Sequence, residues 1–542
     1  MPHHRNKERL SAGDALFLYL EREGMPLNVA SVSVFEGEIS ESACRAFIEL
    51  KLPLIRRYRQ RVVPPPFNLG LPAWEYDPNF DIKNHVREIQ LQNGTDGDLQ
   101  KVAGQILSQL LDRRRPLWDF TLVRGLKGNR TGVVTRMHHC LADGLAGVSL
   151  MNVLMDHKAE VEAHASRKAK VAPLVRSAAP HLLDEVLASS VATAERVLSA
   201  QLELCNLVEA VLDFRTHNGH ANKTPTARSI EAGAIPPFNE LTKFMPELTA
   251  ATQPLPFNII CRGKQNFRWA EIPLAEIKAV KNAFGVTVND VALSIVAAAI
   301  QHYVELREVR VKGRYLRIVM PVNVRGNGSA KELGNRITFV PITLPLDIHG
   351  TKKLLTAIHE RTMFLKRVHI AECVGLAGTM LGTIPTGVQE VIGPIVSQVP
   401  LGLCNLIFTN VPGPDSPLYL LGHRMLCCYP YVPIGGDLGL NCAMLTYCGK
   451  AYFGFSGNAQ AVPNLGRLPT FLRGAFEEIR KSVEMNVTTG TQKAAQRKFQ
   501  PANPAPKPGV TLSESDVRKP VQFVSPRTTT DQNENQPLVG RV

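Results

Sequence analysis

One stretch in the N-terminal half limits what this chain can fold into more than any other. Thr131–Met137 is short, rich in β-branched residues and preceded by the turn-forming pair Gly128-Asn129, which is typical of a β-strand. Leu145–Met155 is an apolar run of helical length, which predicts a buried helix. Between them stand His138 and His139, followed by Asp143 and Gly144. A strand, a loop with two histidines and a helix together can hold an imidazole rigidly.

The adjacent histidines indicate proton-transfer chemistry. A neutral imidazole accepts a proton from a hydroxyl near pH 7, and with an ordinary pKa of about 6.5 roughly three quarters of it is neutral there. Neighbouring strand residues point to opposite faces, so we expect one ring to act and the other to pack. The same divergence argues against a metal site, which needs converging ligands. The pair therefore predicts an enzyme that activates an alcohol or amine without a metal.

Length and composition predict a two-domain globular protein. A chain of 542 residues exceeds one ordinary core, and its 44% apolar content is that of a folded protein. The ten cysteines lack CxxC pairs, which indicates reduced thiols in a cytosolic setting. We find no signal peptide at the N-terminus. The apolar stretch Cys373–Leu403 is interrupted by prolines, which favours a buried helix pair or a surface that dips into lipid over a membrane span.

The excess of basic over acidic residues suggests an anionic partner. The formal net charge is +14, with clusters such as Arg56-Arg57 and Arg113-Arg114-Arg115. No zinc-finger spacing or aromatic–basic RNA-binding pattern is present, so we expect no nucleic-acid partner. A solvated face accounts for part of the charge. An anionic lipid surface or a phosphorylated cosubstrate is the functional interpretation of the rest.

The pattern along the chain predicts an α/β protein. We expect an N-terminal domain over residues 1–215, a crossover linker over 216–256, a C-terminal domain over 257–487 and a disordered tail over 488–542. Ser11-Ala-Gly-Asp14 is a plausible helix start, and Leu274–Phe284 predicts a helix that ends on a left-handed Gly285. Val291–Ile300 predicts a buried helix. Strands are expected at Val29–Phe35, Leu316–Val324, Asn335–Val340 and Leu403–Thr409, with a hairpin around Gly449-Lys450.

Several motifs resemble those of a known family. His138-His139-x-x-x-Asp143-Gly144 resembles the HHxxxDG signature of the CoA-dependent acyltransferase superfamily, which includes chloramphenicol acetyltransferases and peptide-synthetase condensation domains. Five further motifs occur in the order seen in bacterial wax ester synthase/diacylglycerol acyltransferases, and the resemblance covers about residues 9 to 485. They are Pro116-Leu117-Trp118, Val288-Asn289-Asp290-Val291, Met320-Pro-Val-Asn-Val-Arg325, Leu333-Gly334-Asn335-Arg336 and Thr409-Asn410-Val-Pro412-Gly413-Pro414.

This resemblance implies a fold, an activity and residue roles. The fold implied is two chloramphenicol-acetyltransferase-like α/β domains with a substrate tunnel between them. His139 is implied as general base, His138 as its packed supporting neighbour, Asp143 as an orienting residue and Gly144 as the loop turn. The implied reaction moves a long-chain acyl group from acyl-CoA to diacylglycerol, giving triacylglycerol, or to a long-chain alcohol, giving a wax ester. Acyl-CoA is a cosubstrate, and no cofactor is expected.

The remaining motif residues carry structural alternatives. Pro116, Leu117 and Trp118 either shape the wall of the site or simply pack. Asn289 or Asp290 either caps a helix or lines the site. Gly334-Asn335 fits a turn, and Asn410, Pro412 and Gly413 fit either a rigid turn or a substrate channel. The chain also has Leu27-Asn28 where many relatives have Met-His, which leaves acceptor preference open.

Two other functions remain open at this point. One is a non-catalytic lipid-surface protein that keeps the fold, and the other is an acyltransferase with a carrier-bound or polyketide acceptor. No G-x-S-x-G elbow is present, which argues against an acyl-serine intermediate. Basic charge and lipid substrates together predict a cytoplasmic protein that associates peripherally with the inner membrane and with lipid droplets.

Overall fold

The computed structural model describes residues 8–65, 70–141, 144–158, 252–323, 337–367, 398, 400 and 402–498. Residues up to Val487 form one compact unit. Several sequence predictions lie outside the described residues: most of the linker over 216–256, the apolar stretch 373–403 apart from its last residues, Asp143, Gly334, Asn335 and the chain beyond residue 498.

The first of the two large sheets contains the N-terminal strands. Its strand order is β11-β12-β1-β6-β5-β4. The strands are β1 (Asn28–Glu36), β4 (Val86–Gln90), β5 (Trp118–Leu126), β6 (Arg130–His138), β11 (Tyr419–Leu420) and β12 (His423–Tyr431). The same half holds the helices α1 (Ala12–Leu20), α2 (Glu41–Lys51), α3 (Asp96–Leu107) and α4 (Gly144–Leu154) and a small sheet of β2 (Gln60–Val63) and β3 (Ala73–Tyr76). Helix α1 begins as predicted, because the Ser11 hydroxyl accepts a hydrogen bond from the Asp14 amide.

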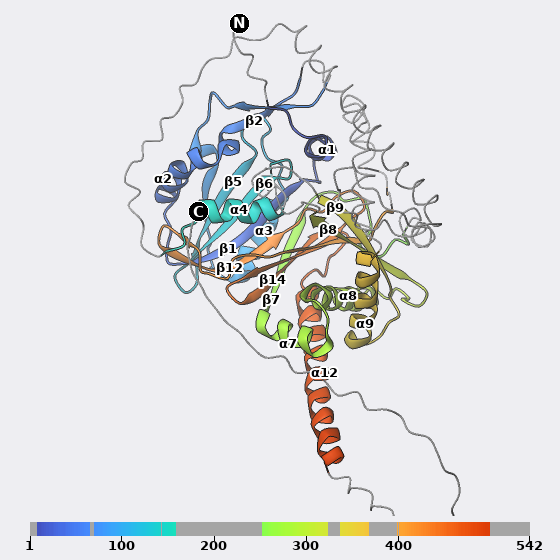
Figure 1. Cartoon of the computed structure of the whole chain (residues 1–542). Coiled ribbons are helices and arrows are strands. Elements are labelled where there is room, and N and C mark those ends of the chain that lie inside the picture. Colours follow the sequence, from blue (N-terminus) through green and yellow to red (C-terminus); the bar gives the residue numbers. More distant parts are fainter. Residues whose placement is uncertain are drawn as a thin grey trace, which may run out of the picture. The chain divides into compact units, whose positions relative to one another are not determined.

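The second sheet has the order β7-β14-β13-β10-β8-β9. Its strands are β7 (Gln265–Pro273), β8 (Tyr315–Asn323), β9 (Ile337–Pro345), β10 (Leu406–Val411), β13 (Leu440–Tyr447) and β14 (Lys450–Asn458). Helices α7 (Leu274–Phe284), α8 (Val288–Leu306), α9 (Thr351–Arg367) and α12 (Arg467–Lys498) complete this half (Figure 1). The predicted buried helix is confirmed: α8 is buried on nearly every side from Asp290 to Val304.

Local signals placed most element ends correctly. Gly285 ends α7 with a φ of +66°, a left-handed cap that costs glycine little. The predicted hairpin is also present, but its turn is Cys448-Gly449, one residue earlier than expected, because Tyr447 pairs with Lys450. Both turn residues have positive φ, the backbone that a two-residue hairpin requires. Helix α12 continues over residues 488–498, so this part of the tail predicted to be disordered is helical.

The two sheets exchange parts of the chain. The expectation of two α/β halves is confirmed, yet β11 and β12 follow the second-half strand β10 in sequence and complete the first sheet, where Tyr431 pairs with Ala30 of β1. Sheet membership therefore crosses the expected linker, and the domain boundaries remain a prediction. The sheets touch where a Cβ on Gly454 of β14 would lie 1.9 Å from the Pro430 carbonyl oxygen of β12. Only glycine permits that approach.

The length and hydropathy of the helices bear on whether they can cross a bilayer. Of those in the described residues, none is by itself both long and apolar enough to span a membrane. The bent pair of α7 and α8, which meet at 103°, satisfies length and composition only when taken together. Much of this pair is buried in the core of the second half.

Candidate active site

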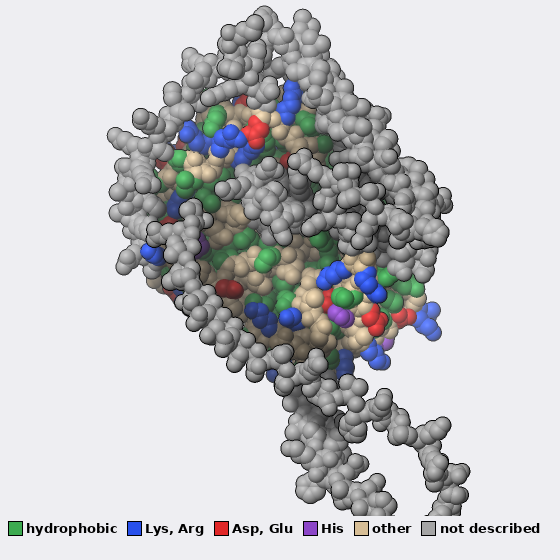
Figure 2. Space-filling view, in the orientation of Figure 1, with side chains coloured by type: hydrophobic (Ala, Val, Ile, Leu, Met, Phe, Trp, Pro, Cys, Tyr) green, Lys and Arg blue, Asp and Glu red, His purple; other side chains and the backbone are tan. Residues whose placement is uncertain are grey.

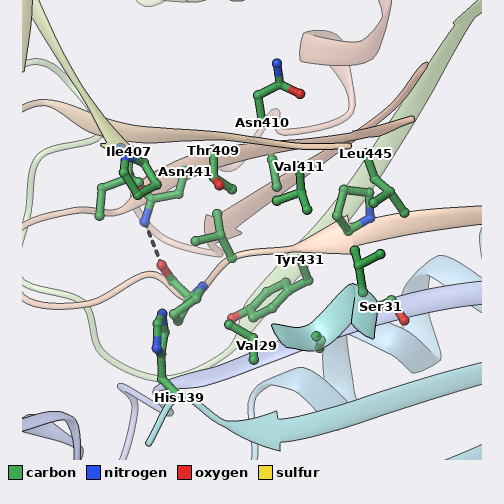
Figure 3. Close-up of a pocket in the computed structure, with 18 of the residues that line it drawn as sticks. Val29, Ser31, His139, Ile407, Thr409, Asn410, Val411, Tyr431, Asn441 and Leu445 are labelled. Atoms are coloured by element: carbon green, nitrogen blue, oxygen red, sulfur yellow. Dashed lines mark hydrogen bonds between the residues drawn. The ribbon is translucent and has the colours of Figure 1, made fainter. Parts of the chain in front are cut away.

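A cavity of about 760 Å³ lies between the two sheets. Strand residues of both sheets line it, and some of them are consecutive, such as Val29–Ser31 and Ile407–Val411. Figure 3 shows side chains of the two sheets facing each other across this space, with His139 at one end and Ser31 at the other. The first sheet contributes Val29, Ser31, Thr135, Met137 and Pro430, and the second contributes Ile407, Thr409, Val411, Asn441, Ala443 and Leu445.

The cavity is largely apolar, as an acyl chain requires. Methionines are prominent among its walls: Met25, Met137, Met151, Met155 and Met320. In the lining that the structure describes, Lys366 is the one lysine or arginine, and no aspartate or glutamate occurs. Lys366 and Phe339 are exposed, so they mark the rim. Apolar walls with few polar groups are typical of a small-molecule site.

His139 lies on the cavity wall at the end of β6. Its ring stacks on the Phe17 ring of α1, with centroids 4.0 Å apart and planes 7° apart. Its backbone N–H donates to the Leu27 carbonyl at 2.9 Å. Helix α1 and the segment before β1 thus hold the residue for which the resemblance implies the role of base.

The surroundings of His139 favour its neutral form. Burial lowers the pKa of this imidazole to about 4, and any positive charge on His138 adds to the decrease. The pKa of this imidazole therefore lies below the ordinary value of about 6.5. At pH 7 the ring is almost entirely neutral, and it can accept a proton.

His138 packs beneath the cavity wall. It is fully buried, and its Nδ1 accepts a hydrogen bond from the Cys140 amide at 3.1 Å. In a neutral ring this leaves the proton on Nε2, which lies 3.5 Å from Oε1 of Glu21. The two rings are thus placed on opposite sides, as alternation along a strand predicts.

The buried Glu21 forms an ion pair with the half-exposed Arg113, and sequence reasoning missed this contact. Glu21 Oε1 accepts from the Leu27 amide at 3.0 Å, and Oε2 accepts from Arg113 Nη2 at 3.1 Å. Burial acts to raise the pKa of Glu21, but the His138 imidazole at 3.5 Å and the Arg113 charge outweigh it and lower that pKa. A glutamate that ends an apolar helix looks like part of a solvated face in sequence, so no signal marked it.

Pro116, Leu117 and Trp118 support the site from behind, since the cavity lining does not include them. The Leu117 carbonyl accepts the His138 N–H at 2.9 Å. Trp118 donates from Nε1 to the Tyr58 carbonyl at 2.8 Å and stacks on the Tyr58 ring. Tyr58 lines the cavity. Their packing role, left open from sequence, is the one that the structure supports.

Asn289 and Asp290 are separated by the structure. Asn289 lines the cavity, whereas Asp290 is buried and does not. The residue that caps α8 is Thr287, and Asp290 completes its capping box from within the first turn. The Asp290 carboxylate also accepts hydrogen bonds from His359 at 2.9 Å and Thr362 at 2.8 Å. Burial would raise its pKa, but these hydrogen bonds, that of His359 first, lower it.

The motif at the end of β10 is also divided. Asn410 and Pro412 line the cavity. The side chains of Asn410 and Thr409 project from opposite faces of the strand (Figure 3). The Nδ2 atom of Asn410 lies 3.4 Å from Oδ1 of Asn289. Gly413 is required by packing, because a Cβ there would lie 2.2 Å from the Thr446 carbonyl oxygen. It does not line the cavity.

Two further observations complete the site. Gly144 begins α4, and its surroundings lie outside the described residues, as does Asp143. In the described part of the chain, no group of three or more His, Cys, Asp or Glu side chains is arranged to hold a metal ion.

Comparison with known proteins decides the family. The model of the wax ester synthase/diacylglycerol acyltransferase catalytic domain matches residues 10–292, and that of the family's C-terminal domain matches residues 333–480. The chain belongs to this family. The resemblance inferred from the motifs is therefore confirmed, and the protein is an O-acyltransferase of the diacylglycerol acyltransferase/wax ester synthase type.

Individual relatives agree. The probable diacylglycerol O-acyltransferases tgs1 and tgs2 of Mycobacterium tuberculosis are each 27% identical to this chain over 87% of its length, and 95% and 98% of their own lengths are covered. The solved wax ester synthase/diacylglycerol acyltransferase of Marinobacter aquaeolei covers 88% of the chain and 100% of its own, at 22% identity and a TM-score of 0.59. The first condensation domain of the CDA synthetase covers 88% and 96% at 15% identity and a TM-score of 0.53. These two structures share the fold.

Proposed function

We propose that this enzyme transfers a long-chain fatty acyl group from acyl-CoA to the hydroxyl of diacylglycerol, with long-chain alcohols as second acceptors. The observation that carries the proposal is a neutral His139 on the wall of a large apolar cavity between the two sheets. The curated relatives named as diacylglycerol O-acyltransferases favour diacylglycerol as the main acceptor.

In the proposed mechanism His139 acts as general base, and Asp143 orients its loop. The imidazole takes the proton of the acceptor hydroxyl while the oxygen attacks the thioester carbonyl, forming a C–O bond. The tetrahedral intermediate then expels the CoA sulfur as the C–S bond breaks, and the imidazolium returns its proton to that sulfur. No acyl group is attached to the protein at any stage.

Base catalysis supplies only part of the rate. A positioned base contributes on the order of 10²–10⁴-fold, so binding both substrates side by side must supply much of the rest. The apolar walls also exclude water, which limits hydrolysis of the thioester.

The deciding experiment compares acceptors and variants. Purified enzyme receives palmitoyl-CoA with dioleoylglycerol, hexadecanol or no acceptor, while a thiol reagent follows CoA release and thin-layer chromatography separates the esters. We expect triacylglycerol first and wax ester second, and a loss of about 10²-fold or more in His139→Ala. Full activity in folded His139→Ala would refute the base. Radiolabel retained on denatured enzyme after incubation with acyl-CoA alone would refute direct transfer.

We further propose that the enzyme works as a peripheral protein on the cytoplasmic face of the inner membrane and on lipid droplets. What supports this is the surface formed by the end of α2 and the 3₁₀ turns η1 (Leu52–Leu54) and η2 (Arg56–Arg59). Leu50 and Leu54 are 64% and 68% exposed, the highest values among large apolar side chains in the described residues. Figure 2 shows Lys and Arg next to hydrophobic side chains over this region, at its upper left.

The same segment touches the site on its inner side. The Arg56 side chain is 57% exposed and pairs with Glu8. Tyr58, two residues later, lines the cavity. Exposed leucines next to an exposed arginine suit the boundary of an anionic bilayer. The free thiol state of every cysteine in the described part fits a reducing compartment.

Vesicle flotation tests this surface. We expect binding to vesicles of phosphatidylcholine with anionic phosphatidylglycerol, weakened by salt, and a drop of about ten-fold or more in Leu50→Ser/Leu54→Ser. Leu306→Ser is the matched control, at a leucine that is 42% exposed at the end of α8. Equal binding by the double variant and the control would refute the proposed surface.

A further inference from the structure

We propose that Glu21 is a positioning residue for His139: its buried carboxylate fixes the position of the catalytic imidazole through the Leu27 backbone, through His138 and, by way of Arg113, through helix α1. This rests on the proposed role of His139 as base. Glu21 does not itself line the cavity, so it acts through its neighbours.

The first link runs through the backbone before β1. Glu21 Oε1 accepts the Leu27 N–H at 3.0 Å, and the carbonyl of the same Leu27 accepts the His139 N–H at 2.9 Å. Leu27 also lines the cavity. The carboxylate therefore sets the position of the peptide unit that anchors the His139 backbone.

The second link runs through His138. Because the Cys140 amide occupies Nδ1, the proton of a neutral His138 lies on Nε2 and faces Glu21 Oε1 at 3.5 Å. A carboxylate opposite this proton favours that tautomer and that ring orientation. The backbone on either side of His139, at His138 and Cys140, is held in consequence.

The third link is the last turn of α1. The Glu21 N–H donates to the Phe17 carbonyl at 3.1 Å, and the Phe17 ring stacks on His139. Arg113 fixes the other end of the carboxylate, since Nη2 contacts Oε2 at 3.1 Å and also donates to the Leu18 carbonyl at 2.6 Å. The Glu21 carboxylate thus contacts the backbone anchor of His139 and its neighbouring ring directly, and it is joined to α1, which carries the stacking partner Phe17, by way of Arg113.

The chemistry of the contacts explains why a carboxylate is needed. Both oxygens of Glu21 face donors: Leu27 and His138 on one side and Arg113 on the other. A glutamine has one acceptor oxygen and one donor NH₂ group, so it must oppose a donor at one of these positions. Glu21→Gln keeps shape and volume but breaks the set of contacts.

Steady-state kinetics of Glu21→Gln test the proposal. A misplacement of about 1 Å costs on the order of 10²-fold, so we expect kcat to fall by about 10- to 100-fold while both KM values stay within about three-fold. The matched control is Asp119→Asn, because Asp119 is an equally buried carboxylate that pairs with Arg136 in the same sheet. That variant should lose thermal stability but keep a kcat near that of wild type.

A double-mutant cycle separates a positioning role from a general loss of native structure. If Glu21 acts partly through His138, the kcat losses of Glu21→Gln and His138→Gln should combine to less than their product. A folded Glu21→Gln enzyme with kcat within two-fold of wild type, or a kcat loss matched by Asp119→Asn, would overturn the proposal. If His139→Ala is inactive but Glu21→Gln keeps its activity, only the positioning role of Glu21 is refuted. If His139→Ala is active, both the role of His139 as base and the positioning role of Glu21 are refuted.

Discussion

At the scale of single residues, the unusual feature is an imidazole whose basicity has been reduced by its surroundings. Burial lowers the pKa of His139 to about 4, so the ring is fully available as a base but is a weak one. The same property makes its protonated form a strong acid, which returns the proton to the leaving sulfur readily. We infer that the cavity favours a concerted transfer, in which the proton leaves the hydroxyl as the C–O bond forms.

This pKa predicts the pH dependence of the reaction. The value of kcat/KM should stay constant from pH 8 down to about pH 5.5. It should fall only as the pH approaches 4, because protonation of His139 removes the base. The folded pKa lies below the unfolded value of about 6.5, so unfolding takes up protons between these values and stability also decreases as the pH falls through them. Circular dichroism at each pH separates the two effects. A midpoint near 6.5 in folded enzyme would contradict the lowered pKa of this half-buried ring.

A second residue-scale prediction separates the neighbours Asn289 and Asp290. Asp290→Ala should lower the free energy of unfolding by about 2–3 kcal/mol, because it leaves the cap of α8 and the donors on His359 and Thr362 without their acceptor. Asn289→Ala should change stability by about 0.5 kcal/mol or less but raise KM several-fold, since it lines the cavity. Thermal denaturation and kinetics of both variants check this. Equal effects on stability would show that the distinction is wrong.

At the scale of elements, contact between the sheets depends on a glycine in the middle of a strand. A Cβ on Gly454 would lie 1.9 Å from the Pro430 carbonyl oxygen and 2.9 Å from the Phe267 ring. Gly454→Ala should therefore destabilise the protein by about 1–3 kcal/mol or more through overpacking. Gly474→Ala is the control: this glycine lies in α12 with open space around its Cβ position, so the change should stabilise by about 0.5–1 kcal/mol. Denaturant unfolding measures both.

The elements also show where prediction from sequence succeeds. Local rules sufficed for α1 at Ser11, for α7 at Gly285 and for the alternating strand before His138, because caps and periodicity depend on adjacent residues. They could not show that Glu21 meets His138, since that contact joins residues more than a hundred positions apart. Nor could they choose between Asn289 and Asp290, because only the packing of α9 against α8 brings His359 to the aspartate.

At the scale of the whole molecule, the exchange of β12 makes the two halves interdependent. Met425, Cys428, Tyr429 and Tyr431 of β12 are buried in the core of the first half, although they follow most of the second half in sequence. Composition places a boundary between residues 215 and 257, but pairing of β12 with β1 is a long-range contact that composition does not encode. The cavity exists because strands from both ends of the chain form its walls.

This interdependence predicts one cooperative unfolding transition for residues 8–487 rather than two. Without β12 the edge of β1 would be unpaired and its core side chains exposed, so a fragment of residues 1–256 should aggregate or stay unfolded. Differential scanning calorimetry of the full chain, together with expression of the fragment alone and with residues 257–487, tests this. We expect a single peak. The Tyr431→Ala substitution should shift this whole peak to lower temperature, because Tyr431 joins the first sheet to Gln265 of the second. Two separate peaks, with a soluble and folded N-terminal fragment, would mean that the halves fold independently and that β12 only docks on a finished sheet.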